Sequence, residues 1–166
     1  MLDCLAAAGP EKALAILDTF TSAVAHRPAG APLPTYVYCS GHYVMARGYG
    51  GLDRWTDERQ PAGAPMNKGT IWREKIETAV LKSECSRACR ALIPGDKVNG
   101  VVVRPTCLYG KGGSYFAMYH FEPALQALEK GEKTFESICS DNGKISTVHA
   151  DDVADLFVRV AERVSR

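Results

Sequence analysis

The feature that most constrains the fold is the nearly continuous apolar run at residues 98–103. Apolar side chains on consecutive residues are typical of a strand covered on both faces, as in parallel sheets with helices on either side. Such a strand needs neighbours along both edges. Arg104 and Pro105 end it. The 166 residues are enough for one domain built around such a sheet, so we expect a single domain over 1–166.

Helical and strand patterns alternate along the chain. Apolar residues with a 3.6-residue period predict helices over residues 11–26, 70–91 and 114–130, with a possible kink at Pro123. A last helix, capped by Asp151 or Asp152, is predicted to run to residue 164. Shorter strands are predicted over residues 35–39, 134–138 and 145–148, and residues 41–69 form a long loop rich in glycine and proline. This alternation predicts an α/β fold with a parallel sheet.

Composition excludes several function classes. Lys and Arg number 20 against 19 Asp and Glu, so the net charge of +1 argues against a nucleic-acid partner. No apolar stretch approaches the ~20 residues of a membrane-spanning helix. The six cysteines come without a secretion signal, which favours a reducing, cytoplasmic location. Cys85 and Cys89 are spaced to share a helix face but lack further ligands nearby, so we expect no metal site.

Candidate site residues follow the strands. In open parallel sheets, ligands bind beyond the carboxyl ends of the strands, which here hold Ser40, Arg104, Pro105 and His149. The Ser40 hydroxyl is placed to bond a substrate carbonyl or hydroxyl, although Ser40 and Gly41 equally suit a plain turn.

Two further segments have a functional and a structural interpretation. Lys111 lies among glycines, whose spacing differs from that of a phosphate-binding loop. We expect the glycines to supply turn dihedrals and Lys111 to meet an anionic substrate group. His149 is followed by Asp151 and Asp152, which suit either a catalytic pair or the capping of the next helix, and capping is favoured.

Four segments in order resemble a known family. They are Tyr36-Val37-Tyr38-Cys39-Ser40-Gly41, then Glu77, then Gly100-Val101-Val102-Val103-Arg104-Pro105-Thr106-Cys107-Leu108-Tyr109-Gly110, then Val148-His149-Ala150-Asp151-Asp152-Val153-Ala154. This order is similar to that of the NAD-dependent epimerase/dehydratase family, the extended short-chain dehydrogenases. The resemblance covers most of residues 11–164. It implies a Rossmann-like sheet, NAD or NADP as cofactor, and a small hydroxyl or carbonyl compound as substrate.

The chain departs from the family in two places. It lacks the glycine-rich turn that binds the pyrophosphate, so we expect a partial Rossmann-like sheet that begins in the helix before the Ser40 strand and stops after the last helix. It also lacks the Tyr-x-x-x-Lys pair, since none of the seven tyrosines has a lysine four residues later. Counting back from Glu77 puts Arg73 at the lysine position and Gly69 at the tyrosine position.

The resemblance assigns roles to individual residues. Ser40, Tyr43 and Arg73 are the candidate catalytic residues, with Tyr43 as a substitute acid. Arg104, Pro105 and Tyr109 are the candidate cofactor-binding residues, and Lys111 and His149 are the candidate substrate contacts. Trp72, beside Arg73, is expected in the core.

Two function hypotheses follow. The first is a fragment of an oxidoreductase or epimerase that acts on a small hydroxyl or carbonyl compound. The second is an inactive remnant that binds a nucleotide or a protein. In either case we expect no measurable NAD(H) affinity for this chain alone. An open sheet edge is expected to cause dimerisation or poor solubility.

Overall fold

The computed structural model describes residues 1–4, 9–24, 26–28, 30–44, 71–81, 98–115, 117–136 and 145–164. Its elements, in chain order, are β1 (Leu2–Asp3), α1 (Pro10–Val24), β2 (Thr35–Cys39), the 3-10 turn η2 (His42–Val44), α2 (Ile71–Leu81), β3 (Asn99–Val103), β4 (Cys107–Tyr109), the π-helix η4 (Ala117–Phe121), α4 (Glu122–Glu129), β5 (Thr147–His149) and α5 (Ala150–Val164). Only the first four residues of the predicted loop 41–69 are described, and Cys85 and Cys89 lie outside these ranges.

The strands form two parallel sheets. One has the order β1-β2-β3, and the other pairs β4 with β5. Helices lie between the paired strands along the chain, as parallel pairing requires. The predicted α/β class with a parallel sheet is therefore confirmed.

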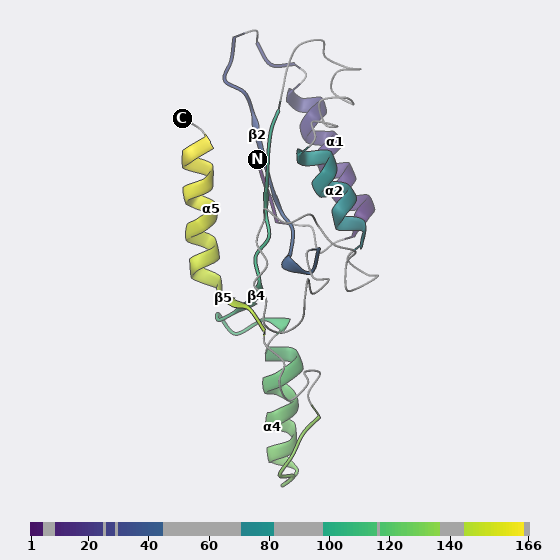
Figure 1. Ribbon diagram of the computed structural model, residues 1–166, viewed down its shortest axis with the longest axis vertical. Coiled ribbons are helices and arrows are strands. Elements are labelled where there is room, and N and C mark those ends of the chain that lie inside the picture. Colours follow the sequence, from purple (N-terminus) through teal and green to yellow (C-terminus); the bar gives the residue numbers. More distant parts are fainter. Residues whose placement is uncertain are drawn as a thin grey trace, which may run out of the picture.

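The central strand of the larger sheet is β2, whose middle residues Tyr36, Val37 and Tyr38 are buried. Because side chains alternate along a strand, Tyr36 and Tyr38 face α1 and α2, while Val37 faces α5. Figure 1 shows α1 and α2 on one side of the sheet and α5 on the other. The apolar run at 98–103 is thus covered on both faces as expected, although β3 pairs only with β2 within the described ranges.

The sequence did not predict β1. The chain was expected to begin in a helix, but Leu2 and Asp3 pair with β2 before α1 starts. Three bonds secure this short strand: the amino group of Met1 donates to the Thr35 carbonyl at 2.6 Å, Val37 N–H donates to the Met1 carbonyl, and the Tyr36 hydroxyl donates to the buried Asp3 carboxylate at 2.6 Å. A two-residue strand is too short to show alternation, so only its partner reveals it.

Two other segments differ from the prediction. The segment 107–109, for which no element was predicted, forms β4 because β5 pairs with it. Residues 134–136, expected as strand, have no regular structure, and residues 137 and 138 lie outside the described ranges. Phe135, the apolar residue there, is 44% exposed, so its side chain is not buried as it would be in a strand packed on the core. Pro123, the predicted kink position, lies in the first turn of α4, directly after the π-helix η4.

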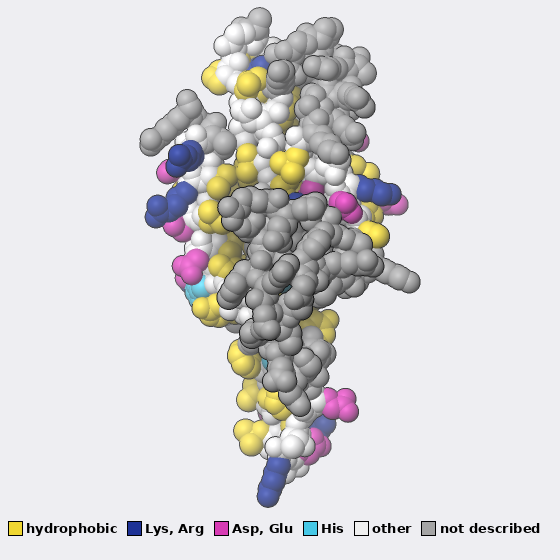
Figure 2. Space-filling model, in the orientation of Figure 1, with side chains coloured by type: hydrophobic (Ala, Val, Ile, Leu, Met, Phe, Trp, Pro, Cys, Tyr) yellow, Lys and Arg dark blue, Asp and Glu magenta, His cyan; other side chains and the backbone are white. Residues whose placement is uncertain are grey.

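Hydrophobic side chains gather on the surface of the part formed by η4 and α4 (Figure 2). Met118, Phe121, Leu125 and Leu128 are each more than half exposed. Among the helices that the structure describes, none has the length and apolar character needed to cross a bilayer.

Candidate functional site

The carboxyl ends of β2 and β3 lie side by side. Ser40 N–H donates to the Val103 carbonyl at 2.8 Å, and His42 N–H donates to the Pro105 carbonyl at 3.1 Å. The parallel register of the two strands therefore brings together Ser40 and Pro105, two of the residues that the sequence singled out. The β4–β5 pair lies just beyond this edge, since β4 follows β3 after three residues (Figure 1).

The hydroxyl of Ser40 is buried without a partner. Ser40 is 6% exposed, and its Oγ makes no hydrogen bond to any of the described residues. The phenol of Tyr38, two residues earlier and on the same side of the sheet, is also buried and has no hydrogen-bond partner in the described part of the chain. Burial raises its pKa far above the usual range. A buried hydroxyl without a partner costs stability, and such groups are rare in folded proteins. Two of them at the end of one strand mark this region as unusual.

Arg73 reaches the turn that follows Ser40. Its guanidinium comes within 3.7 Å of where a Cβ on Gly41 would stand, so the side chain reaches from α2 to the turn after Ser40. The guanidinium also lies 5.2 Å from the ring centre of Trp72. Trp72 packs against the core cluster between α1 and α2, which confirms its predicted packing role. Among the predicted catalytic residues, Ser40 and Arg73 are therefore close neighbours.

Tyr43, the third candidate, lies in η2 and is 42% exposed. Its ring packs on that of His42, with 4.2 Å between the ring centres and an interplanar angle of 32°. This places it on the surface of the turn that follows Ser40.

His42 makes the stability of this edge of the sheet depend on pH. Burial lowers its pKa, and the Pro105 carbonyl acts in the opposite direction with smaller effect. Since the folded-state pKa is depressed, the unfolded chain binds more protons in acid. The stabilising contribution is complete above the unfolded-state pKa of about 6.5 and is lost as the pH falls toward the folded-state value.

We therefore expect the free energy of unfolding to fall between about pH 7.5 and about pH 5.5, and His42→Gln to remove part of that fall. Urea unfolding at the two pH values measures it. His26→Gln, at an exposed histidine, is the control and should keep the wild-type pH dependence. An unchanged pH dependence in His42→Gln would contradict the prediction.

Glu77 and Arg104 form a buried ion pair that the sequence did not predict. Nε of Arg104 donates to both carboxylate oxygens of Glu77 at 3.1 Å, and its NH2 donates to Oε2 at 2.6 Å. The Glu77 side chain is 3% exposed and that of Arg104 20%. Arg104, predicted to bind a cofactor, thus directs its guanidinium at α2. No local pattern in the sequence signals this pair, because the two residues are 27 positions apart.

The second parallel pair brings Tyr109 and His149 together. They are register partners, and their rings meet edge to face with centres 5.1 Å apart. His149 Nδ1 accepts the backbone N–H of Asp151 at 3.2 Å. Because α5 begins at Ala150, His149 is its N-cap residue. This corrects the expectation that an aspartate caps the helix: Asp151 and Asp152 lie inside the first turn, where carboxylates complement the helix dipole.

The glycine loop after β4 leaves room for the ring of His149. Gly110 has a φ of +96°, and a Cβ there would stand 2.7 Å from Cδ2 of His149 and closer still to Nε2. Lys111 and Gly112 also have positive φ. The loop thus uses left-handed turn dihedrals, which confirms the structural interpretation of its glycines.

Lys111 reaches Asp151. Its Nζ lies 3.0 Å from Oδ2, and both side chains are more than 60% exposed. An exposed pair of this kind contributes little to stability, so it breaks at small cost when another anion competes. The structure therefore gathers Tyr109, Lys111 and His149 into one cluster beyond the sheet edge.

The described residues do not fit a dinucleotide. A pyrophosphate binds free backbone N–H groups at a glycine-rich turn that leads from a strand into a helix. Here β1 leads into α1 through Gly9 and Pro10. Proline has no N–H, and Gly9 is the only glycine between the two elements. We therefore assign no hydride transfer to these residues.

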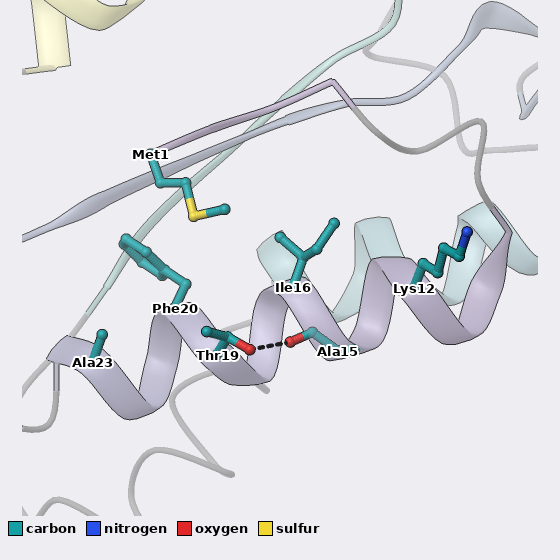
Figure 3. A pocket seen from close by; sticks show the side chains of 7 residues that line it. All are labelled: Met1, Lys12, Ala15, Ile16, Thr19, Phe20 and Ala23. Carbon is teal, nitrogen blue, oxygen red and sulfur yellow. Dashed lines mark hydrogen bonds between the residues drawn. The ribbon is translucent and has the colours of Figure 1, made fainter.

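A shallow apolar groove lies elsewhere, along α1 (Figure 3). It has a volume of about 490 Å³ and is lined by Met1, Lys12, Ala15, Ile16, Thr19, Phe20 and Ala23. Its threonine hydroxyl is already bonded to the Ala15 carbonyl at 2.7 Å. None of the predicted site residues lines it, so the groove offers no support for the predicted chemistry.

Comparison with protein-family models, with curated proteins and with solved structures finds no match. The resemblance to epimerases and dehydratases therefore remains an expectation from the sequence.

Proposed function

We propose that the carboxyl edge of the larger sheet binds a small hydroxyl- or carbonyl-bearing molecule, in a protein of the epimerase/dehydratase kind. The observation that carries this proposal is the buried, unbonded Oγ of Ser40 at the end of the central strand. A ligand carbonyl that accepts from this hydroxyl satisfies a group whose isolation otherwise costs the fold about 1–3 kcal/mol.

The surrounding charges favour an electron-rich ligand group. Arg73 brings a permanent positive charge to the turn after Ser40. Lys111, held only by an exposed pair with Asp151, is available to an anionic group at the far end of the same ligand. These residues bind and orient the ligand, and a hydrogen bond from the Ser40 hydroxyl polarises its carbonyl group.

The second candidate is binding without turnover, as in a remnant that has kept a nucleotide or protein ligand. The observation that favours it is the glycine at position 69, the place of the family's tyrosine acid. Arg73, at the place of the lysine, keeps a charge but does not tune a neighbouring acid as an ammonium does. The two candidates share the ligand site and differ in whether product forms.

The test is Ser40→Ala, with dihydroxyacetone and dihydroxyacetone phosphate as probes. Removing an unbonded buried hydroxyl should leave the free energy of unfolding unchanged or raise it by about 1 kcal/mol, while probe binding is lost. Chemical-shift titration of the full, nitrogen-labelled chain measures binding, and urea unfolding measures stability.

Thr21→Ala is the matched control. Thr21 is also buried, but its hydroxyl donates to the Asp18 carbonyl at 2.9 Å. This variant should lose about 1 kcal/mol of stability and keep probe binding. If Ser40→Ala destabilised the chain as Thr21→Ala does, or if wild type showed no shifts with either probe, the proposed site would be wrong. Conversion of a bound probe would favour the enzyme, and binding alone the remnant.

A further inference from the structure

Two cysteines lie at the ends of neighbouring strands: Cys4 directly follows β1, and Cys39 is the last residue of β2. The register pairs Asp3 of β1 with Tyr38 of β2, so the next residues along, Cys4 and Cys39, are adjacent across the strands. Register partners on parallel strands point to the same face of the sheet, with backbones about 4.8 Å apart. Disulfides join residues whose Cα atoms are about 4.4–6.8 Å apart, so the backbone spacing suits a bridge here.

The two thiols are neighbours and differ in their access to solvent. Each lies close enough to the other to affect its pKa, and both are free thiols. Cys4 is exposed, whereas Cys39 is half-buried in the cluster on the α5 side of the sheet, with Val103 and Val148. A reagent from solvent therefore meets Cys4 first, and Cys39 is its only neighbouring thiol in the described part of the chain.

We propose that Cys4 and Cys39 form a reversible dithiol–disulfide pair, which is oxidised by a small disulfide of the glutathione type. The Cys4 thiolate attacks one sulfur of glutathione disulfide and releases one glutathione thiolate. The Cys39 thiolate then attacks Cys4 Sγ, forms the internal disulfide and releases the second glutathione. The two cysteines lose two electrons and two protons in total, and one glutathione disulfide becomes two glutathiones.

The exchange is slow at neutral pH and accelerates in base. Burial raises the pKa of Cys39 to about 11, with the Cys4 thiol and Asp3 adding to the rise and the Arg73 guanidinium opposing it. Burial also raises the pKa of Cys4. Because the thiolate is the attacking species, the rate should rise about tenfold per pH unit between about pH 7 and pH 8.5.

The disulfide would restrain the carboxyl edge of the larger sheet. Cys39 directly precedes Ser40, whose N–H holds β2 to the Val103 carbonyl of β3. A disulfide at Cys39 ties β1 to this point and closes a loop that contains all of α1. Oxidation therefore fixes the end of the central strand, independently of whether the proposed ligand binds there.

The test uses the full chain in glutathione buffers that run from fully reduced to fully oxidised. Remaining thiols are trapped with N-ethylmaleimide, and peptides are identified by mass spectrometry. We expect a Cys4–Cys39 disulfide in wild type and in the control variant Cys107→Ser, reversed by excess reduced glutathione. In Cys39→Ser, Cys4 should accumulate a glutathione adduct, while in Cys4→Ser the half-buried Cys39 should stay reduced.

Several results would overturn the proposal. These are reduced Cys4 and Cys39 in the most oxidising buffer, glutathione adducts on both without an internal disulfide, or bridges that join either one to another cysteine. A bridge that survives excess reduced glutathione would also overturn it, because the pair would then be a permanent structural disulfide.

Discussion

Replacing Glu77 with methionine is expected to lower the free energy of unfolding by about 3 kcal/mol. The carboxylate holds Arg104 through three contacts of 2.6 to 3.1 Å, and its own side chain is 3% exposed. Losing it leaves a guanidinium with one-fifth exposure and no counter-charge among the residues that the structure describes. That remaining exposure puts the expected cost at the lower end of the range for buried pairs.

A double-mutant cycle separates the pair from the general effect of substitution. Arg104→Met should also destabilise, and the double variant should lose less than the sum, with a coupling of about 2 kcal/mol. The matched pair is Asp155 and Arg159 on α5, which is joined at 2.5 Å but more than half exposed. The double-mutant cycle of this exposed pair should show no measurable coupling, because water screens the attraction between the two charges. Urea unfolding measures all variants, and equal coupling in the two pairs would contradict the prediction.

The sequence predicted the parts of the fold that have long patterns. The run at 98–103 and the periodic helices around it were enough for a parallel α/β arrangement, because apolar side chains recur there over many residues. The strands β1 and β4 have two and three residues and depend on their partners. Long-range pairing of this kind leaves no periodic signal in the segment itself.

The candidate site shows the same division. Placing Ser40 and Pro105 at one edge follows from parallel strand ends, which sequence position alone predicts. The role of His149 was missed, because histidine is not among the residues that usually cap helices. The Glu77–Arg104 pair was missed for another reason: the residues are 27 positions apart, and only the packing of α2 on β3 brings them together.

Replacing Gly100 with alanine is expected to lower the free energy of unfolding about as much as Glu77→Met does. Gly100 also lies where α2 packs on β3. A Cβ at this position in β3 would stand 2.8 Å from the carbonyl carbon of Val80 in α2 and closer still to its oxygen. Backbone atoms cannot turn aside as a side-chain end does, so α2 must move away from the sheet. We expect a loss of about 3 kcal/mol, the upper part of the usual range for overpacking.

Gly113→Ala is the matched control for this substitution. No atom lies within 4 Å of the Cβ that it would add, and Gly113 is not among the glycines with positive φ. Its effect should stay within about 0.5 kcal/mol in urea unfolding. Because α2 carries Arg73 and Glu77, Gly100→Ala should also weaken probe binding at Ser40 and the coupling between Glu77 and Arg104. A Gly100→Ala chain as stable as Gly113→Ala would show that α2 does not pack on β3 at this distance.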